Sequence, residues 1–287
     1  MTVNEQALWL HGEGFDMLGI VSPPPAQTPM QRTGVLIVVG GAQYRVGSHR
    51  QFVQLARCLA AGGFPVLRFD LPGMGDSPGE LPSFEDTAPH IAAAIDGLQR
   101  QCPGAERVVL WGLCDGASAS LLYVQATSDP RVAGLALLNP WVRSEASLAR
   151  TQVKHYYRQR LLEPAFWRKL LQGGVGAQAL RSLRDNLVRM QRAPAAPLSF
   201  QHRMADGWHR FTGPVLLLLS ERDLTAQEFN EYADTSPAWA GWRHKALLTQ
   251  HGLAGADHTC SAATSRTAAE QATLPWLHTI GPAHLAK

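Results

Sequence analysis

Short apolar runs alternate with stretches of helical periodicity along most of the chain. We expect strands at residues 7–10, 17–21, 35–39, 66–69, 108–110, 132–138, 215–219 and 245–248. We expect helices at residues 49–61, 84–100, 117–125 and 262–278, with Pro89 disturbing the first half of the second helix. The runs at 35–39 and 215–219 are apolar at every position, which is typical of strands buried on both faces of a sheet. The pattern therefore predicts an α/β fold in which helices flank a mostly parallel sheet.

The segment from residue 143 to residue 211 interrupts this alternation, because it has helical periodicity and no convincing strand. We interpret it as a helical cap, or lid, inserted into a core formed by residues 1–142 and 212–287. Residues 143–210 include 13 basic and 4 acidic side chains, a net charge of +9, whereas the whole chain has a net charge of +3. The positive charge is therefore concentrated in the insertion.

The composition is that of an ordinary folded enzyme, with 45% apolar and 17% charged residues among 287. No stretch approaches the roughly 20 apolar residues of a membrane span, and the first ten residues do not resemble a secretory signal. We therefore expect a cytoplasmic protein with no transmembrane segment. The modest net charge gives no indication of nucleic-acid binding.

The four cysteines are Cys58, Cys102, Cys114 and Cys260. They form neither a C-x-x-C pair nor a zinc-ligand spacing, so we expect reduced thiols, no metal and no organic cofactor. Cys58 and Cys102 are expected to be bystanders, and Cys260 either lines the site or serves in packing.

One cysteine has a distinctive context. Residues 108–118 comprise an apolar strand, a G-x-C-x-G turn centred on Cys114, and the start of a helix. A nucleophile on such a sharp turn needs small neighbours, which Gly112 and Gly116 supply. The turn also places Cys114 at a helix N-terminus, where the helix dipole favours a thiolate. The sequence therefore predicts that Cys114 is a nucleophile rather than a buried structural cysteine.

The expected partners of Cys114 follow it in the order acid, then histidine. Asp223 lies just beyond the strand at 215–219, at the edge of a parallel sheet where catalytic groups collect. His258 follows the last expected strand and precedes the last helix. We expect His258 to take the thiol proton and Asp223 to orient the imidazole. The alternatives are His244 and His251 for the base, and Glu221, Asp234 and Asp257 for the acid.

Two backbone amides are expected to hold the oxyanion of the reaction. One is the amide of Asp115, the residue after the nucleophile. The other comes from the loop after the strand at 35–39, from Ala42 or, as the alternative, from Gln43. Gly40 and Gly41 permit the close backbone approach that this loop needs.

Tyr44, Arg45, His49 and Arg50 follow the oxyanion loop. They could clamp a substrate carboxylate or phosphate, for which arginine is well suited, or they could be the solvated start of a helix. The basic insertion likewise has two interpretations. Its charged face could simply be solvated, or it could attract an acidic partner, such as an acyl carrier protein or the phosphates of coenzyme A, or an anionic membrane surface.

These motifs together resemble the α/β-hydrolase superfamily over essentially the whole chain except the insertion. The resemblance rests on the Gly40-Gly41 loop, the loop at 70–77, the turn at 112–116, Asp223 and residues 255–258. More narrowly, residues 40–52 and 112–116 resemble the bacterial hydrolases associated with the exosortase A system, which are linked to exopolysaccharide loci. The cysteine turn also resembles those of dienelactone hydrolases and polyhydroxyalkanoate synthases.

The chain departs from most of the superfamily at two positions. Cys114 stands where serine is usual, and Gly40 stands where a His-Gly pair commonly opens the oxyanion loop. The cysteine favours thioester or acyl-transfer chemistry. We therefore expect a hydrolase that cleaves an ester or thioester of a small molecule through an acyl-cysteine intermediate. The alternatives are an acyltransferase that passes the acyl group to an alcohol or amine, and a non-catalytic small-molecule binding module.

Overall fold

The structure is a computed structural model that describes residues 4–41, 43–143 and 198–280. The chain divides into two units, Met1–Val142 with Phe200–Lys287, and Arg143–Ser199. The first unit is a core that contains every helix and strand described below. Most of the expected insertion, including most of its basic residues, lies outside the described residues.

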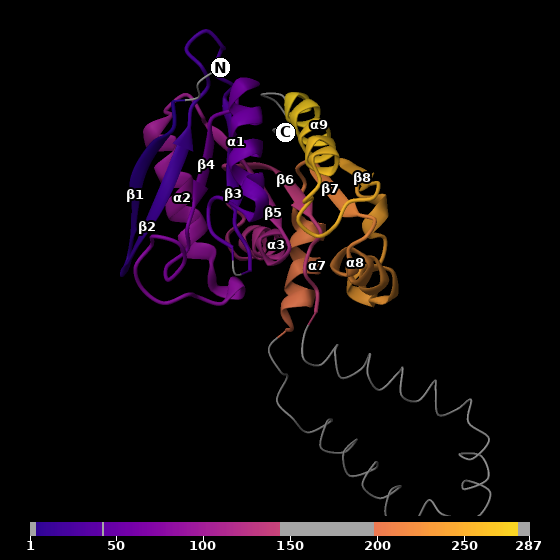
Figure 1. Ribbon diagram of the computed structural model, residues 1–287. Coiled ribbons are helices and arrows are strands. Elements are labelled where there is room, and N and C mark those ends of the chain that lie inside the picture. The colour runs from indigo at the N-terminus through magenta and orange to yellow at the C-terminus, as the bar shows by residue number, and fades with distance from the viewer. Residues whose placement is uncertain (1–3, 42, 144–197, 281–287) are drawn as a thin grey trace, which may run out of the picture. The chain divides into compact units, whose positions relative to one another are not determined.

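Eight strands of the described residues form one sheet in the order β1-β2-β4-β3-β5-β6-β7-β8 (Figure 1). The strands are β1 (Gln6–Gly12), β2 (Phe15–Ser22), β3 (Thr33–Val38), β4 (Val66–Phe69), β5 (Arg107–Leu113), β6 (Val132–Leu138), β7 (Val215–Ser220) and β8 (Leu248–Leu253). The pairs β1–β2 and β2–β4 are antiparallel, and the five remaining pairs are parallel. The expected mostly parallel sheet is confirmed.

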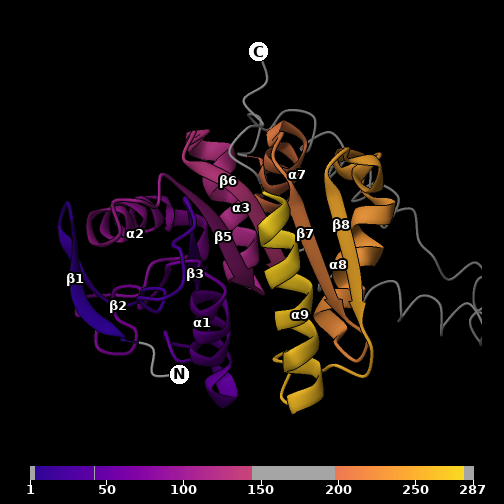
Figure 2. The ribbon, with the colours of Figure 1, turned by 90° about the horizontal axis from the view of Figure 1, so that it is seen from above.

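Helices cover both faces of this sheet, as the view from above shows (Figure 2). They are α1 (Gln51–Ala61), α2 (Ala88–Gln101), α3 (Asp115–Thr127), α7 (Phe200–Arg210), α8 (Leu224–Thr235) and α9 (Ala263–Thr279). Single 3-10 turns occur at Ser48–Arg50, Phe84–Asp86, Pro237–Trp239 and Trp242–His244. Helices α1 and α9 lie on one face, and α2 and α3 on the other. Every residue of β3, β4 and β7 is buried, because each strand packs against helices on both sides.

Two of the larger differences between the expected and the observed element boundaries have a physical reason. The last strand, expected at 245–248, is β8 at Leu248–Leu253. Its residues are mostly exposed or half-buried, so the strand lacks the apolar signature of the central ones. Helix α2 begins at Ala88, because Pro89 lies in its first turn, where a proline is tolerated.

Helix α7 belongs to the core, although the sequence analysis placed it in the insertion. The core therefore resumes at Phe200, the first residue of α7, rather than at residue 212. The helix packs on α3 and approaches it closely at Gly207, where a Cβ atom would overlap the carbonyl oxygen of Leu121. Lys245 donates from Nζ to the carbonyl oxygens of Trp208 and Phe211. It thereby provides hydrogen bonds to carbonyl groups at the C-terminal end of α7, which have no partner within the helix.

A nearly buried arginine on β4 joins the N-terminal segment to the sheet. Arg68 is 3% exposed and donates to Glu5 at 3.0 Å and to the carbonyl oxygen of Arg45 at 3.0 Å. Arg57 of α1 binds the same Glu5 carboxylate at 2.8 Å. Glu5 therefore links the first residues of the chain to both the sheet and a helix.

No helix in the described ranges has the length and apolar character needed to cross a membrane.

Candidate active site

Cys114 lies on a sharp turn between β5 and α3. Its backbone angles are φ 59° and ψ −125°, a conformation that is rare for a residue with a side chain. The amide of Cys114 donates to the carbonyl oxygen of Leu138 on β6 at 2.9 Å, which fixes the turn at the edge of the sheet. A strained backbone of this kind is typical of a site where a side chain must be held out for reaction.

The glycines on either side of the turn are sterically required. A Cβ atom at Gly112 would overlap the backbone of Gly116, and a Cβ atom at Gly116 would overlap the carbonyl oxygen of Val38. The end of β3, the end of β5 and the start of α3 therefore touch through their backbones. The expected role of the small residues in G-x-C-x-G matches this packing.

Asp223 and His258 meet at the same edge of the sheet. His258 donates from Nδ1 to the Asp223 carboxylate at 2.8 Å. The other carboxylate oxygen of Asp223 accepts from the amide of Thr225 at 3.1 Å, so the aspartate also caps α8. Asp223 is only 5% exposed, which holds its carboxylate in one orientation. The structure thus brings together the two residues that the sequence places 35 positions apart.

The Cys114 side chain lies beside the imidazole of His258, close enough to affect its protonation. The hydrogen bond to Asp223 and then the neighbouring Cys114 side chain raise the pKa of His258 to about 10, although partial burial opposes the charged form. The imidazole therefore binds a proton strongly, and it lies between an aspartate and the sulfur. This arrangement can move a proton between the sulfur and a leaving group or water.

The expected oxyanion donors are only partly described. Asp115 begins α3 next to Cys114, and its carboxylate lies among the amides of Gly41, Asp115 and Gly116. Ala42 lies outside the described residues. The side chain of Gln43 accepts weakly from the amide of Ser48 and from Gln51, each at 3.3 Å, which orders the segment after the loop.

The four residues expected to clamp a substrate anion have different surroundings. The guanidinium of Arg45 binds the carboxylates of Asp70 and Asp76, so its charge is already paired within the core. Tyr44 is 45% exposed beside it. His49 and Arg50 are also exposed, with positive φ angles of 53° and 61°.

His49 lies near the loop that carries the imidazole. A charge on this side chain helps to lower the pKa of Asp257, the neighbour of His258, although the hydrogen bonds from Ser261 contribute most. Asp257 was an alternative candidate for the acid. Its carboxylate accepts hydrogen bonds from both the amide and the hydroxyl of Ser261. Another rejected candidate, Asp234, is bound by Arg243 and by Trp242.

The sequence of this chain matches a known protein family. Residues 35–271 match the model of the alpha/beta hydrolase family, which covers most of the chain, including all three site residues. The chain belongs to the alpha/beta hydrolase family. No curated protein matches the sequence.

Several solved structures share the fold of this chain. An esterase from Pyrococcus furiosus superposes with a TM-score of 0.64 at 15% identity, over 97% of this chain and 94% of that one. The Est1E protein of Butyrivibrio proteoclasticus, solved with ferulic acid, gives 0.61 at 14% identity, over 96% and 99%. A serine hydrolase without a lid from Xanthomonas campestris gives 0.57 at 15% identity, over 96% of each chain.

Asn139 is a site residue that the sequence analysis missed. It follows β6 with a positive φ of 49° and is completely buried. Its amide nitrogen donates to the Ser220 hydroxyl at 3.0 Å and to the His258 carbonyl oxygen at 3.2 Å, and its oxygen accepts from the Ser220 amide at 2.8 Å. Asn139 therefore ties the histidine loop of this hydrolase to the ends of β6 and β7. In the sequence, Asn139 is followed by Pro140, a pair that is typical of a turn but does not indicate a contact with His258.

The other three cysteines lie in surroundings unlike that of Cys114. Burial raises the pKa of Cys58 and of Cys102, and it raises the pKa of Cys260 to about 11. Cys102 and Cys260 are buried, so their thiols are neutral packing groups. Among the described residues, no group of three or more His, Cys, Asp or Glu side chains is arranged to hold a metal.

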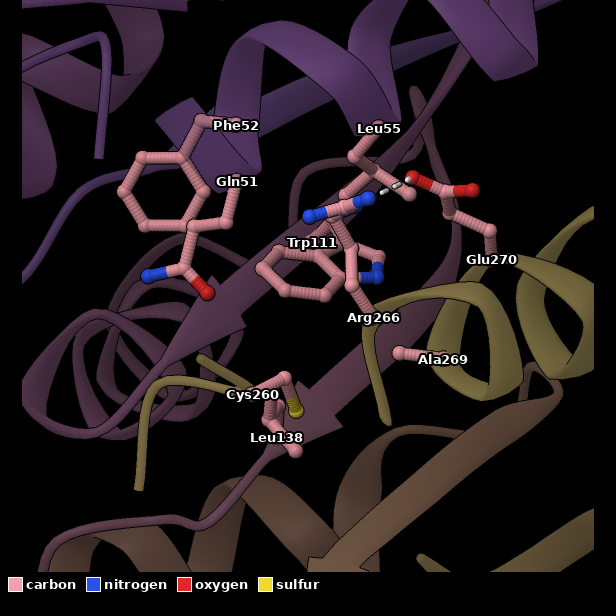
Figure 3. Close-up of a pocket in the computed structure, with 9 residues that line it drawn as sticks. All are labelled: Gln51, Phe52, Leu55, Trp111, Leu138, Cys260, Arg266, Ala269 and Glu270. Carbon is pink, nitrogen blue, oxygen red and sulfur yellow. Dashed lines mark ion pairs between the residues drawn. The ribbon is translucent and has the colours of Figure 1, made fainter. Parts of the chain in front are cut away.

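Cys260 lines a small cavity between the sheet and the helices α1 and α9 (Figure 3). The cavity measures about 20 Å³, enough for a single water molecule. Arg266 and Glu270 of α9 face each other across one side at 3.9 Å, near the ring of Trp111. Its size excludes a substrate, so the expected packing role for Cys260 is the better interpretation.

Proposed function

We propose that this alpha/beta hydrolase cleaves an ester or thioester of a small molecule through a covalent acyl-cysteine intermediate. The observation that supports it best is the hydrogen bond between His258 and Asp223 beside Cys114, with the cysteine held on a strained turn. The cysteine at this turn also supports our inference that the chain is a cysteine-nucleophile member of the family, like the exosortase A system-associated hydrolases.

The first step transfers the acyl group to the enzyme. His258 accepts the thiol proton, and the Cys114 sulfur attacks the acyl carbonyl carbon. The carbonyl oxygen becomes an oxyanion, which the amides of Asp115 and Ala42 are proposed to stabilise. When the oxyanion collapses, the bond to the leaving group breaks, and His258 returns its proton to the leaving alkoxide or thiolate.

The second step releases the acyl group. Once Cys114 is acylated, its sulfur no longer supports the charge on His258, so the pKa of the imidazole falls. The neutral imidazole then takes a proton from water, whose oxygen attacks the acyl carbon. Breakage of the carbon–sulfur bond yields the carboxylic acid, and the proton on His258 returns to the sulfur.

The proposal is tested by intact-protein mass spectrometry after mixing with acyl thioesters of increasing chain length. We expect a transient acyl adduct on wild-type protein, none on Cys114→Ala, and an accumulating adduct on His258→Ala. Cys260→Ala serves as the matched control and should behave as wild type. An adduct that persists in Cys114→Ala would contradict the proposal, as would the absence of any adduct with every donor.

The same experiment separates hydrolysis from acyl transfer. Release of the free acid without an acceptor supports the hydrolase. An acyl-enzyme that is stable in water but is discharged by an added alcohol or amine would establish the transferase alternative instead.

A further inference from the structure

Arg45, in the loop after β3, is held by its backbone as well as by its side chain. Its amide donates to Oδ1 of Asp70 at 2.7 Å, and its carbonyl oxygen accepts from Nη1 of Arg68 at 3.0 Å. Its guanidinium binds the carboxylates of Asp70 and Asp76. Both backbone polar groups and the side chain of Arg45 are therefore fixed by β4 and the loop that follows it.

The aspartate that binds Arg45 is itself fixed to the sheet. Asp70 is completely buried and directly follows β4. Its Oδ2 atom also accepts from the amide of Asp76 at 3.1 Å, and its carbonyl oxygen accepts from the Ser77 hydroxyl at 2.9 Å. The same hydroxyl accepts from the amide of Leu18 on β2 at 2.8 Å. Asp70 is therefore a rigid anchor for the loop that carries Arg45.

The loop after β3 is also held where it begins. Gly40 packs on the turn that carries Cys114, because a Cβ atom at Gly40 would overlap the Asp115 carboxylate and the amide nitrogen of Gly116. Strands β3 and β4 are parallel neighbours in the sheet (Figure 1), so their carboxyl ends lie at the same edge. The loop thus passes from the turn of the nucleophile to the anchor at Asp70.

The position of this loop matters for the proposed reaction, because the loop is expected to supply one of the two amides that stabilise the oxyanion. Such a donor works only within hydrogen-bond distance of the oxyanion, and a displacement of about 1 Å can lower a rate by about 100-fold. The described residues between Gly40 and Arg45 belong to no helix or strand, so no regular backbone hydrogen bonds hold them. Their position must come from the contacts at the two ends of the loop.

On the basis of the proposed function, we propose that Arg45, anchored by Asp70, is a positioning residue that holds the loop after β3 where its amide stabilises the oxyanion. Arg45 acts through the loop rather than on the substrate, since two carboxylates already bind its guanidinium. This role explains an arginine at this position without an anionic group on the substrate.

The test compares two reactions of Cys114, of which only one forms an oxyanion. In acylation by a thioester, the sulfur attacks a carbonyl carbon, whose oxygen gains negative charge. In alkylation by iodoacetamide, the sulfur attacks the methylene carbon and iodide leaves, so no oxyanion develops. Both reactions need the Cys114 thiolate, but only acylation needs the oxyanion donors. Both rates are measured by mass spectrometry of the Cys114 peptide after an acid quench.

Arg45→Met should lower the limiting rate of acylation by about 10- to 100-fold without changing the thioester concentration at half-saturation, because the oxyanion forms only during the reaction. Its rate of alkylation should stay at the wild-type value. Arg45→Lys keeps the charge but not the planar fork that binds two carboxylates. Its acylation should therefore fall by only about 2- to 10-fold, the equivalent of one hydrogen bond.

Arg131→Met is the matched control. Arg131 also binds two carboxylates, those of Asp96 and Asp129, but it precedes β6, at the opposite end of the parallel strands from Cys114. This variant should leave both rates of Cys114 unchanged.

Wild-type acylation by Arg45→Met would overturn the proposal. So would an equal fall in acylation and alkylation, because it would show a general effect on the thiolate rather than on the oxyanion. If Arg45→Met does not fold, Arg45→Lys, which retains the charge, decides between the same outcomes. In each case acylation of wild-type Cys114 would leave the proposed function intact, whereas a wild-type protein without any acyl adduct would overturn both.

Discussion

Two side chains raise the pKa of His258, and they contribute unequally. The Asp223 hydrogen bond contributes most to its raised pKa, and the neighbouring Cys114 side chain comes second. The enzyme therefore has a proton carrier whose affinity for the proton changes with the state of the sulfur. This property permits one imidazole to serve as acid in the first step and as base in the second.

Replacement of Asp223 by Asn is expected to lower the pKa of His258 from about 10 by roughly 1–3 units, because the neutral amide supports the imidazolium poorly. Cys114→Ala should lower it by less. The measurement is a pH titration of the His258 ring by NMR, with Cys58→Ala as a control that leaves the titration unchanged. An equal or greater fall in the Cys114 variant would reverse the assigned order of the two contributions.

Asn139→Ala is expected to destabilise the fold by about 1–3 kcal/mol and to reduce kcat, because Ser220 and the His258 carbonyl lose their partner in a buried place. Asn139→Asp keeps the acceptor for the Ser220 amide but places an acceptor oxygen against the His258 carbonyl oxygen in a fully buried place. It should therefore be at least as damaging as the alanine variant. Urea unfolding and steady-state kinetics measure the two effects, and a variant with unchanged kcat would show that Asn139 does not position the histidine.

The sequence predicted the three central side chains because their order and their places after strands are local signals. Nothing local indicated the contacts of Asn139 or the pairing of Arg45 with Asp70 and Asp76, since these join segments that are distant along the chain. The buried carboxylate of Asp115 was hidden for a similar reason. Its backbone amide was expected to act, but its side-chain surroundings depend on how closely the Gly40 loop packs.

The strands with complete burial were the easiest to predict, whereas the position of the half-exposed strand β8 was predicted poorly. The runs that became β3 and β7 are apolar throughout because both faces are covered. In contrast, β8 is a half-exposed edge strand whose residues resemble a loop. Helix α8 was not predicted, because Asp223, which begins it as an N-cap, was interpreted only as a catalytic acid.

Gly207→Ala tests the close packing of α7 on α3. The added methyl group would overlap the Leu121 carbonyl oxygen and push the helices apart, which should cost about 1–3 kcal/mol despite the better helix propensity of alanine. Urea unfolding measures the loss. Gly252→Ala is the control, since a Cβ atom on that residue of β8 meets nothing within 4 Å, and it should unfold like wild type.

The attachment of the N-terminal segment through Glu5 predicts a pH-dependent stability of the entire core. Burial raises the pKa of Glu5, but the hydrogen bond from Arg57 and the charges of Arg68 and Arg57 outweigh it, so the pKa is lowered overall. A depressed carboxylate pKa stabilises the fold above the unfolded-state pKa, and the stabilisation disappears as pH falls through the folded-state value.

Glu5→Gln should accordingly reduce the free energy of unfolding at pH 7, because it leaves the nearly buried Arg68 without its counter-charge. The difference from wild type should shrink as pH falls through the lowered folded-state pKa of Glu5, because below that pKa both side chains are neutral. Chemical denaturation at a series of pH values measures this convergence. A difference that stays constant over the whole acid series would mean that the contact contributes through packing rather than charge.

The uneven protection of the four thiols has a consequence for oxidative damage. Peroxides attack thiolates that they can reach, whereas burial keeps the thiols of Cys58, Cys102 and Cys260 in the unreactive neutral form. Oxidation by a peroxide would therefore begin at Cys114, whose thiol proton His258 can accept, and it would convert the sulfur to a sulfenic acid. A serine at the same turn would be immune, so the choice of sulfur makes catalysis the part of this protein most sensitive to oxidants.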